Sequence, residues 1–199
     1  MYRKFGKRLI DSFLAIIGIV VCIVPMIVIS ICIKIDSKGP VIFKQKRLGK
    51  NKKPFMIMKF RTMCDHAYEK GGIAKKSSDA RITRVGKILR KTSLDELPQF
   101  FNILAGEMSI IGPRPILDWE FNEYKSNKRY NHRYDALPGM FCTVDLNYRA
   151  KADRNLQFSM DADYVDDICF ITDSKIFFKI IKTVILGENV YAEEENENE

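Results

Sequence analysis

Two adjacent acidic residues, Asp95 and Glu96, lie in the segment Ser93–Gln99, shortly before a proline. Proline fits the first turn of a helix, where its missing N–H is not needed, so Pro98 predicts a helix start near Asp95. A capping box formed by Ser93 and Glu96 is the alternative register, but it would push Pro98 deeper into the helix. Acids at a helix start often only cap it, yet a carboxylate pair can also act as nucleophile, base or metal ligand.

Four basic residues accompany this pair in a chain whose net charge is +8. Guanidinium groups bind phosphate oxygens bidentately, and a divalent cation held by carboxylates would neutralise further negative charge. Each basic residue alone is typical of a solvated surface. Together with the acidic pair they indicate phosphoryl chemistry, with a lipid as the substrate class that a membrane-attached chain favours. The four residues are Lys59 and Arg61 at the end of a predicted strand, Arg90 before the pair, and Arg114 in Gly112–Pro115.

The membrane attachment is predicted from the uncharged segment Phe13–Ile33, which as one helix would reach roughly 31 Å and match the hydrocarbon core. Pro25 lies near its middle and basic residues crowd both flanks. The positive-inside tendency places both flanks in the cytoplasm, which favours a re-entrant helix bent at Pro25. A simple spanning helix with a tolerated proline stays open as the alternative. The flanking residues are Arg3, Lys4, Lys7 and Arg8 before the segment, and Lys34, Lys38, Lys44, Lys46 and Arg47 after it.

The remaining patterns predict an α/β fold. Strands Val41–Gln45 and Phe55–Phe60 should form a hairpin around Gly49–Lys53. Helices are expected over Ile82–Lys91, from Asp95 to Leu104 with an end at Gly106, and over Ser174–Leu186, closed by Gly187. The last helix gathers Lys175, Lys179 and Lys182 in a narrow arc, which fits a helix lying in the membrane interface, although a helix packed into a core fits the spacing equally.

Three regions follow from these features: a membrane helix at 1–36, a catalytic domain at 37–188, and an acidic, disordered tail at 189–199. The apolar run is too long for a cleaved signal peptide, and we expect it to be retained. The basic body suggests anionic lipid headgroups, phosphorylated substrates or nucleic acid as partners. The five cysteines are odd in number and scattered, which argues for reduced thiols.

Several segments together resemble a known family, the bacterial sugar transferases called polyprenyl-phosphate phosphoglycosyl transferases. The likeness runs from about Tyr2 to Gly187 and is greatest to the small monotopic members, which lack an added bundle of spanning helices. The segments are Asp79–Gly86, Leu89–Gln99 and Met108–Pro115, and Lys59–Met63 matches another motif of the family.

The resemblance implies a re-entrant membrane helix broken at a proline, interfacial amphipathic helices, Mg²⁺, and an active site on the cytoplasmic face of the bacterial cytoplasmic membrane. It implies transfer of a sugar 1-phosphate from a nucleotide diphosphate sugar, such as a UDP-sugar, to polyprenyl (undecaprenyl) phosphate, with release of UMP. This would be the first membrane step of glycoconjugate assembly, and downstream glycosyltransferases would be partners.

The same resemblance implies roles for individual residues. Asp95 would be the nucleophile and form a phosphosugar-aspartyl intermediate, and Glu96 would assist with the metal or the incoming phosphate. Asp95 and Glu96 would together bind Mg²⁺. The residues expected to hold phosphates are Lys59, Arg90 and Arg114, with Arg61 as a further candidate. Asp161 and Tyr164 fit a downstream family pattern without a role that the sequence indicates.

Two departures from the family pattern bear on these expectations. Val24 stands where a serine usually precedes the helix-breaking proline, so the hydroxyl that could satisfy a freed backbone carbonyl is absent. The segment Leu137–Asn147 lacks the usual arginine before Pro-Gly and the Gly-Trp-Ala-Gln run after it, which leaves the nucleotide sugar less defined than the reaction type.

Two alternatives to an enzyme stay open. A catalytically altered family member could bind lipid or a partner as a scaffold, which the divergent segment favours and the intact acidic pair opposes. A membrane-tethered nucleic-acid-binding protein has only the basic charge in its favour, because no base-reading module is recognisable. We therefore expect no nucleic-acid partner.

Overall fold

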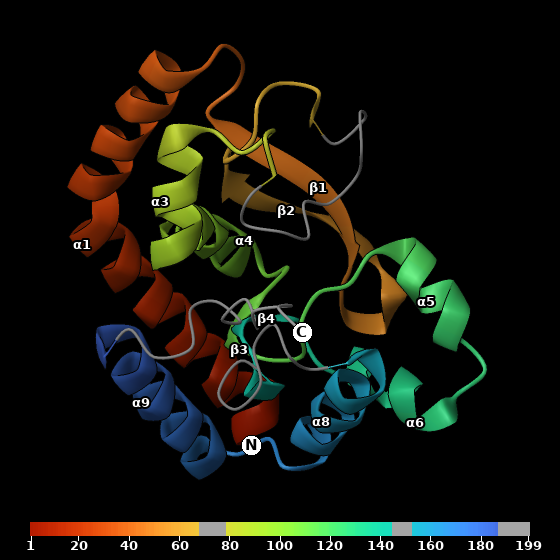
Figure 1. Ribbon diagram of the computed structural model, residues 1–199. Coiled ribbons are helices and arrows are strands. Elements are labelled where there is room, and N and C mark those ends of the chain that lie inside the picture. Colours follow the sequence, from red (N-terminus) through yellow and green to blue (C-terminus); the bar gives the residue numbers. More distant parts are fainter. Residues whose placement is uncertain (68–78, 145–152, 187–199) are drawn as a thin grey trace, which may run out of the picture.

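The computed structural model describes residues 1–67, 79–144 and 153–186, and for Lys4 and 183–186 the backbone alone. The chain forms an α/β arrangement, as predicted, in which helices surround two small sheets (Figure 1). The elements are a π-helical turn (Tyr2–Gly6), α1 (Lys7–Asp36), β1 (Ile42–Leu48), β2 (Pro54–Phe60), α3 (Arg84–Thr92), α4 (Gln99–Ala105), β3 (Ser109–Ile111), α5 (Asp118–Tyr124), α6 (Lys128–Asn131), β4 (Gly139–Phe141), α8 (Arg154–Asp166) and α9 (Phe170–Leu186), with short 3₁₀ turns at Lys50–Lys52, Leu94–Glu96 and His132–Asp135.

The predicted hairpin is confirmed. β1 and β2 pair antiparallel from Ile42 opposite Phe60 to Leu48 opposite Pro54. Pro54 takes the first position of its strand, where a proline costs little. The register places Lys59 at the end of the hairpin that lies farthest from the connecting turn.

The second sheet is small and parallel, with Ser109 opposite Gly139 and Ile111 opposite Phe141. The two strands are connected by close backbone contact at their glycines. A Cβ atom on Gly139 would lie 2.1 Å from the backbone nitrogen of Gly112, so no side chain fits there. The glycine of the Pro-Gly dipeptide in the divergent segment is therefore required by packing. Residues 145–147 of that segment lie outside the described residues.

The expected break of the membrane helix at Pro25 takes a different form. α1 continues as one helix from Lys7 to Asp36 with Pro25 inside it, and Figure 1 shows it changing direction near its middle. A proline removes its own N–H bond and crowds the preceding turn, but the hydrogen bonds on either side persist, so the helix bends instead of ending. Only Asp11, Ala15 and Ile33 of α1 are buried, and this is the helix of the described residues that is long and apolar enough to cross a membrane.

The main core lies between the hairpin and the helices α4, α8 and α9. Phe55, Ile57, Ile103, Ile110 and Val165 are among its buried members. The side chain of Asn102, fully buried on α4, binds the backbone of β2, accepting from Met58 N at 2.9 Å and donating to Met56 O at 2.8 Å. These bonds hold α4, and the turn before it, across the hairpin.

α9 begins earlier than predicted, at Phe170 instead of Ser174. The interpretation as a helix packed into a core is confirmed for one face of α9, and the interfacial interpretation stays a prediction. Ile176 and Ile180 are buried in the main core, whereas Phe178 and Ile181 are exposed together with Lys175, Lys179 and Lys182. The predicted cap Gly187 and the acidic tail at 189–199 lie outside the described residues. The five cysteines, which are all described, form no disulfide.

Candidate active site

The acidic pair lies in a 3₁₀ turn, Leu94–Glu96, between α3 and α4. This corrects the predicted helix from Asp95 to Leu104, because α4 itself starts at Gln99 with Pro98 as its N-cap. Pro98 has no N–H to bond back along the chain, so this turn closes through the shorter bond from Leu97 N to Leu94 O at 3.3 Å. Gly106, with φ +83°, ends the helix as predicted.

Lys59 reaches both carboxylates from the end of β2. Its Nζ lies 2.5 Å from Oε1 of Glu96 and 3.9 Å from Oδ2 of Asp95. The Asp95 side chain is only 14% exposed. The structure therefore brings three predicted residues into one partly buried cluster, in which Glu96 and not Asp95 makes the close ion pair with the lysine.

Arg90 joins this cluster from α3. Its Nε donates to Oγ1 of Thr62 at 2.9 Å. Thr62 O accepts from Thr83 N at 3.1 Å, and a Cβ atom on Gly86 would lie 2.0 Å from the same oxygen, so the first turn of α3 sits directly on the segment after β2. This close approach sets the direction of α3 and thereby the place of Arg90 beside the acidic turn.

The electrostatics of the cluster single out Asp95. Burial raises the pKa of its carboxyl to about 6; Lys59 and Arg90 act in the opposite direction and Glu96 adds to the rise. Such a carboxylate is ionised at neutral pH but more basic than an exposed aspartate. It is consequently suited to attack an electrophilic centre that the neighbouring cations attract.

Arg61 does not share this site, although it is close in sequence to Lys59. Its side chain is 5% exposed, and its guanidinium binds carbonyl oxygens at the end of α1, including Ser37 O at 2.7 Å. Its positive charge interacts with the C-terminal end of α1, which carries a negative partial charge.

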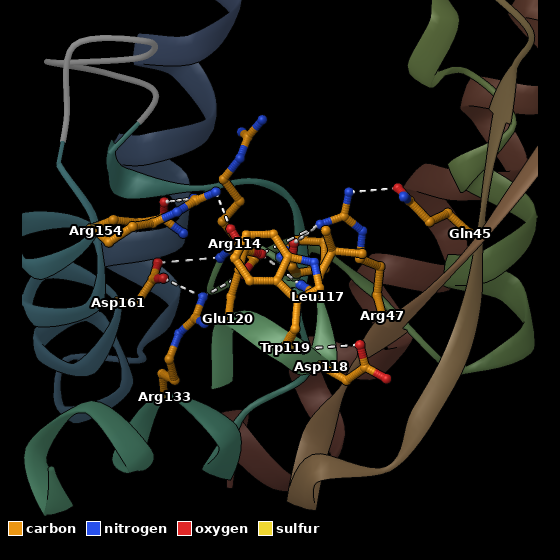
Figure 2. A network of polar contacts seen from close by, with 12 residues as sticks. Gln45, Arg47, Arg114, Leu117, Asp118, Trp119, Glu120, Arg133, Arg154 and Asp161 are labelled. Carbon is orange, nitrogen blue, oxygen red and sulfur yellow. Dashed lines mark hydrogen bonds and ion pairs between the residues drawn. The ribbon is translucent and has the colours of Figure 1, made fainter. Parts of the chain in front are cut away.

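Arg114 lies in a second polar network (Figure 2), where its backbone N–H donates to Oδ1 of Asp161 at 3.3 Å. Asp161, fully buried, forms an ion pair with Arg133 at 2.6 Å, and Arg133 also donates to the carbonyl oxygen of Arg114. Nη1 of Arg114 lies 3.9 Å from Sγ of Cys142. Ile116, two residues after Arg114, pairs with Leu48 beside the connecting turn of the hairpin. Lys59 lies near the opposite end of the hairpin, and the strand between these two positions is about 17 Å long.

Sequence reasoning missed the residues that build this second network. Glu120, buried, binds Arg154 and the N–H of Leu117. In a separate contact, Tyr164 donates to Oδ1 of Asp173 at 2.7 Å. Arg154 and Arg133 lie 34 and 28 residues from the carboxylates that they bind, Glu120 and Asp161, and no spacing marks them. The roles of Asp161 and Tyr164 thus emerge only from their buried contacts.

The residues present allow a magnesium site with two carboxylate ligands. Within the described part of the chain no group of three or more His, Cys, Asp or Glu side chains is arranged to hold a metal. Asp95 and Glu96 offer two carboxylates, and Mg²⁺ commonly binds through one or two carboxylates completed by substrate phosphates and water. The acidic pair fits that pattern.

Residues 2–187 match the model of a family described as bacterial sugar transferase. The chain is 38% identical over 187 residues to UDP-N-acetylgalactosamine-undecaprenyl-phosphate N-acetylgalactosaminephosphotransferase of Aeromonas hydrophila, which covers 92% of this chain and 44% of the relative. It is 35% identical to the uncharacterized sugar transferase EpsL of Bacillus subtilis, over 92% of this chain and 89% of the relative. UDP-glucose:undecaprenyl-phosphate glucose-1-phosphate transferase of Klebsiella pneumoniae is also 35% identical, over 93% of this chain and 41% of the relative. The chain thus spans less than half the length of two of these relatives.

Proposed function

Because the chain belongs to the bacterial sugar transferase family, we propose that it transfers a sugar 1-phosphate from a UDP-sugar to undecaprenyl phosphate and releases UMP. The observation that carries the proposal is the buried carboxylate of Asp95, held 3.9 Å from Lys59 while Glu96 takes the close ion pair. Two relatives whose names state this type of transfer support the choice of substrates.

In the first step a carboxylate oxygen of Asp95 attacks the sugar-bearing phosphorus of the donor. A P–O bond to Asp95 forms, the bridging P–O bond to UMP breaks, and its electron pair leaves with UMP. In the second step an oxygen of undecaprenyl phosphate attacks the same phosphorus and the bond to Asp95 breaks. The two displacements regenerate the carboxylate and predict ping-pong kinetics.

The neighbouring residues have distinct tasks in this scheme. Lys59 and Arg90 attract and orient the phosphate groups, since both lie close enough to Asp95 to act on its charge. Glu96 holds Lys59 in place, which keeps the ammonium near the reacting phosphorus without neutralising Asp95. Mg²⁺, held by Asp95 and Glu96, would supply positive charge that screens the approach of an anion to a phosphate.

The proposed location is the cytoplasmic face of the bacterial cytoplasmic membrane. The large apolar residues of α1 are mostly exposed, which suits contact with lipid tails. α9 presents exposed Phe178 and Ile181 beside its lysines, a combination suited to the boundary between acyl chains and phosphate headgroups. The re-entrant course of α1, bent at Pro25, would keep both basic flanks on that face.

The direct test mixes the full-length protein with a panel of nucleotide sugars and undecaprenyl phosphate and measures release of each nucleoside monophosphate. We expect release from a UDP-sugar, a stoichiometric burst when the acceptor is omitted, and loss of activity in excess chelator. The exposed Asp163, paired with Arg129 on the surface, provides a control, and Asp163→Asn should retain activity. Lipid binding without release from any donor would favour the scaffold alternative instead.

Topology has its own test. Single cysteines at Arg3 and Lys44, placed in a variant whose native cysteines are serines, should both be labelled only from the cytoplasmic side. Pro25→Ala should restore a continuous run of hydrogen bonds and move a fraction of molecules to an external amino terminus. Labelling of Arg3Cys from outside in the parent protein would contradict the re-entrant course.

A further inference from the structure

The C-terminal end of α1 is bound by the guanidinium of Arg61, the residue that follows β2. Nη2 donates to Ser37 O at 2.7 Å, to Ser37 Oγ at 3.0 Å and to Ile33 O at 3.3 Å, and Nη1 donates to Lys38 O. The last carbonyls of a helix have no partners within it and carry its negative partial charge. Arg61 therefore caps the end of the membrane helix from the catalytic domain.

The turn after α1 leaves space for the side chain of Arg61. Gly39 has φ +118°, a backbone conformation that favours glycine, and a Cβ atom there would lie 2.0 Å from Nη1 of Arg61. A side chain at Gly39 would displace the guanidinium. The contact is thus built from both sides, by the arginine and by the glycine that makes room for it.

A second contact joins α1 to α3. Oδ2 of Asp36, the last residue of α1, accepts from Val85 N in the first turn of α3 at 3.0 Å. α3 carries Arg90, whose Nε binds Thr62, the neighbour of Arg61. The contacts form a closed path from α1 through Arg61 and Thr62 to Arg90, and back along α3 to Asp36.

We propose that Arg61 and Asp36 are positioning residues, which fix Arg90 relative to Asp95 by holding α3 and the end of β2 to the end of the membrane helix. The inference rests on the proposed function for its catalytic consequence, because Arg90 orients phosphate there. Arg61 itself touches no substrate. Its guanidinium is buried and already bound to α1, so the placement of α1 in the membrane determines the geometry of the site.

Amide hydrogen exchange on the full-length protein in lipid nanodiscs tests the contacts without reference to activity. Asp36→Ala should speed exchange at Val85 by about tenfold or more, whereas Asp36→Asn keeps an oxygen that can accept the bond and should stay near the parent rate. Arg61→Gln should speed exchange at Ser37, whose N–H closes the last turn of α1. Arg129→Gln, which removes an exposed surface arginine, is the control and should change neither.

The kinetics of nucleoside monophosphate release test whether these contacts affect catalysis. Arg61→Gln and Asp36→Ala should each lower kcat about tenfold to a hundredfold with the KM for the nucleotide sugar within about twofold, and Asp36→Asn should restore kcat. A raised KM at unchanged kcat and unchanged exchange would make Arg61 a substrate-binding residue and overturn the proposal. If the parent protein releases no nucleoside monophosphate, the proposed function fails, while the exchange rates at Val85 and Ser37 still decide the contacts.

Discussion

Two aspartates of this protein, the partly buried Asp95 and the fully buried Asp161, have opposite surroundings. Asp161 is completely buried and bound by Arg133 at 2.6 Å and by the backbone N–H of Arg114. Asp95 is partly buried, with its side chain 14% exposed, and Lys59 stays 3.9 Å away and binds Glu96 instead. The charge of Asp161 is balanced by Arg133, whereas Asp95 stays ionised at neutral pH at a cost in folding free energy.

The difference separates a structural carboxylate from the one that we propose as the nucleophile. A buried carboxylate with a close guanidinium partner holds elements together, and its oxygens are stabilised by hydrogen bonds that make them poorer nucleophiles. A buried carboxylate without such a partner has a raised pKa and a free energy penalty that a phosphate ligand with its cation can relieve. Each of the following variants tests one side of this contrast.

The largest effect is expected from Asp95→Asn. Removing the attacking charge with almost no change of shape should lower the rate of nucleoside monophosphate release roughly 10⁴-fold or more. Membrane attachment, measured by flotation with liposomes, should be unchanged. Turnover at the parent rate would exclude Asp95 as the nucleophile.

Asp161→Asn should instead destabilise the fold. It leaves the guanidinium of Arg133 buried without its counter-charge, and breaking one side of such a pair costs about 3–5 kcal/mol. Pulse proteolysis in urea on the detergent-solubilised protein measures the free energy of unfolding. A loss below about 1 kcal/mol would show that the pair contributes little, and the contrast with Asp95 would collapse.

The smallest effect is a gain in stability from Asp95→Asn. Because burial raises the pKa of Asp95 from 3.8 to about 6, the folded state binds a proton that the unfolded state has lost between these values, so this group lowers stability as pH rises through that window. At pH 7.5 the variant should therefore be more stable than the parent by about 1–3 kcal/mol. The advantage should shrink toward zero near pH 4, and the same proteolysis assay over a pH series checks it. A variant less stable than the parent at pH 7.5 would contradict the penalty.

The sequence alone was sufficient for features that depend on local chemistry. The hairpin followed from two short apolar runs around a basic turn, the end of α4 from Gly106, and the cluster of Lys59, Asp95 and Glu96 from motifs that place these residue types in order. Propensity, capping and turn preferences act over a few residues, and motifs preserve residues whose neighbours are fixed by function.

Tertiary structure decided what each charge does. Lys59 and Arg61 are two residues apart and would share one face of a continuing strand, but β2 ends at Phe60. Lys59 therefore reaches the acidic pair from the strand, whereas Arg61 turns to the end of α1. Arg114 was grouped with the phosphate-binding residues by its motif, and the structure places its backbone in a network with Asp161 whose members are remote in sequence. Burial, which sets the pKa of Asp95, is likewise a property of the packed chain, because it depends on neighbours that the linear order does not name. The bend of α1 follows from Pro25 itself, and the structure adds that the helix continues through the proline to Asp36.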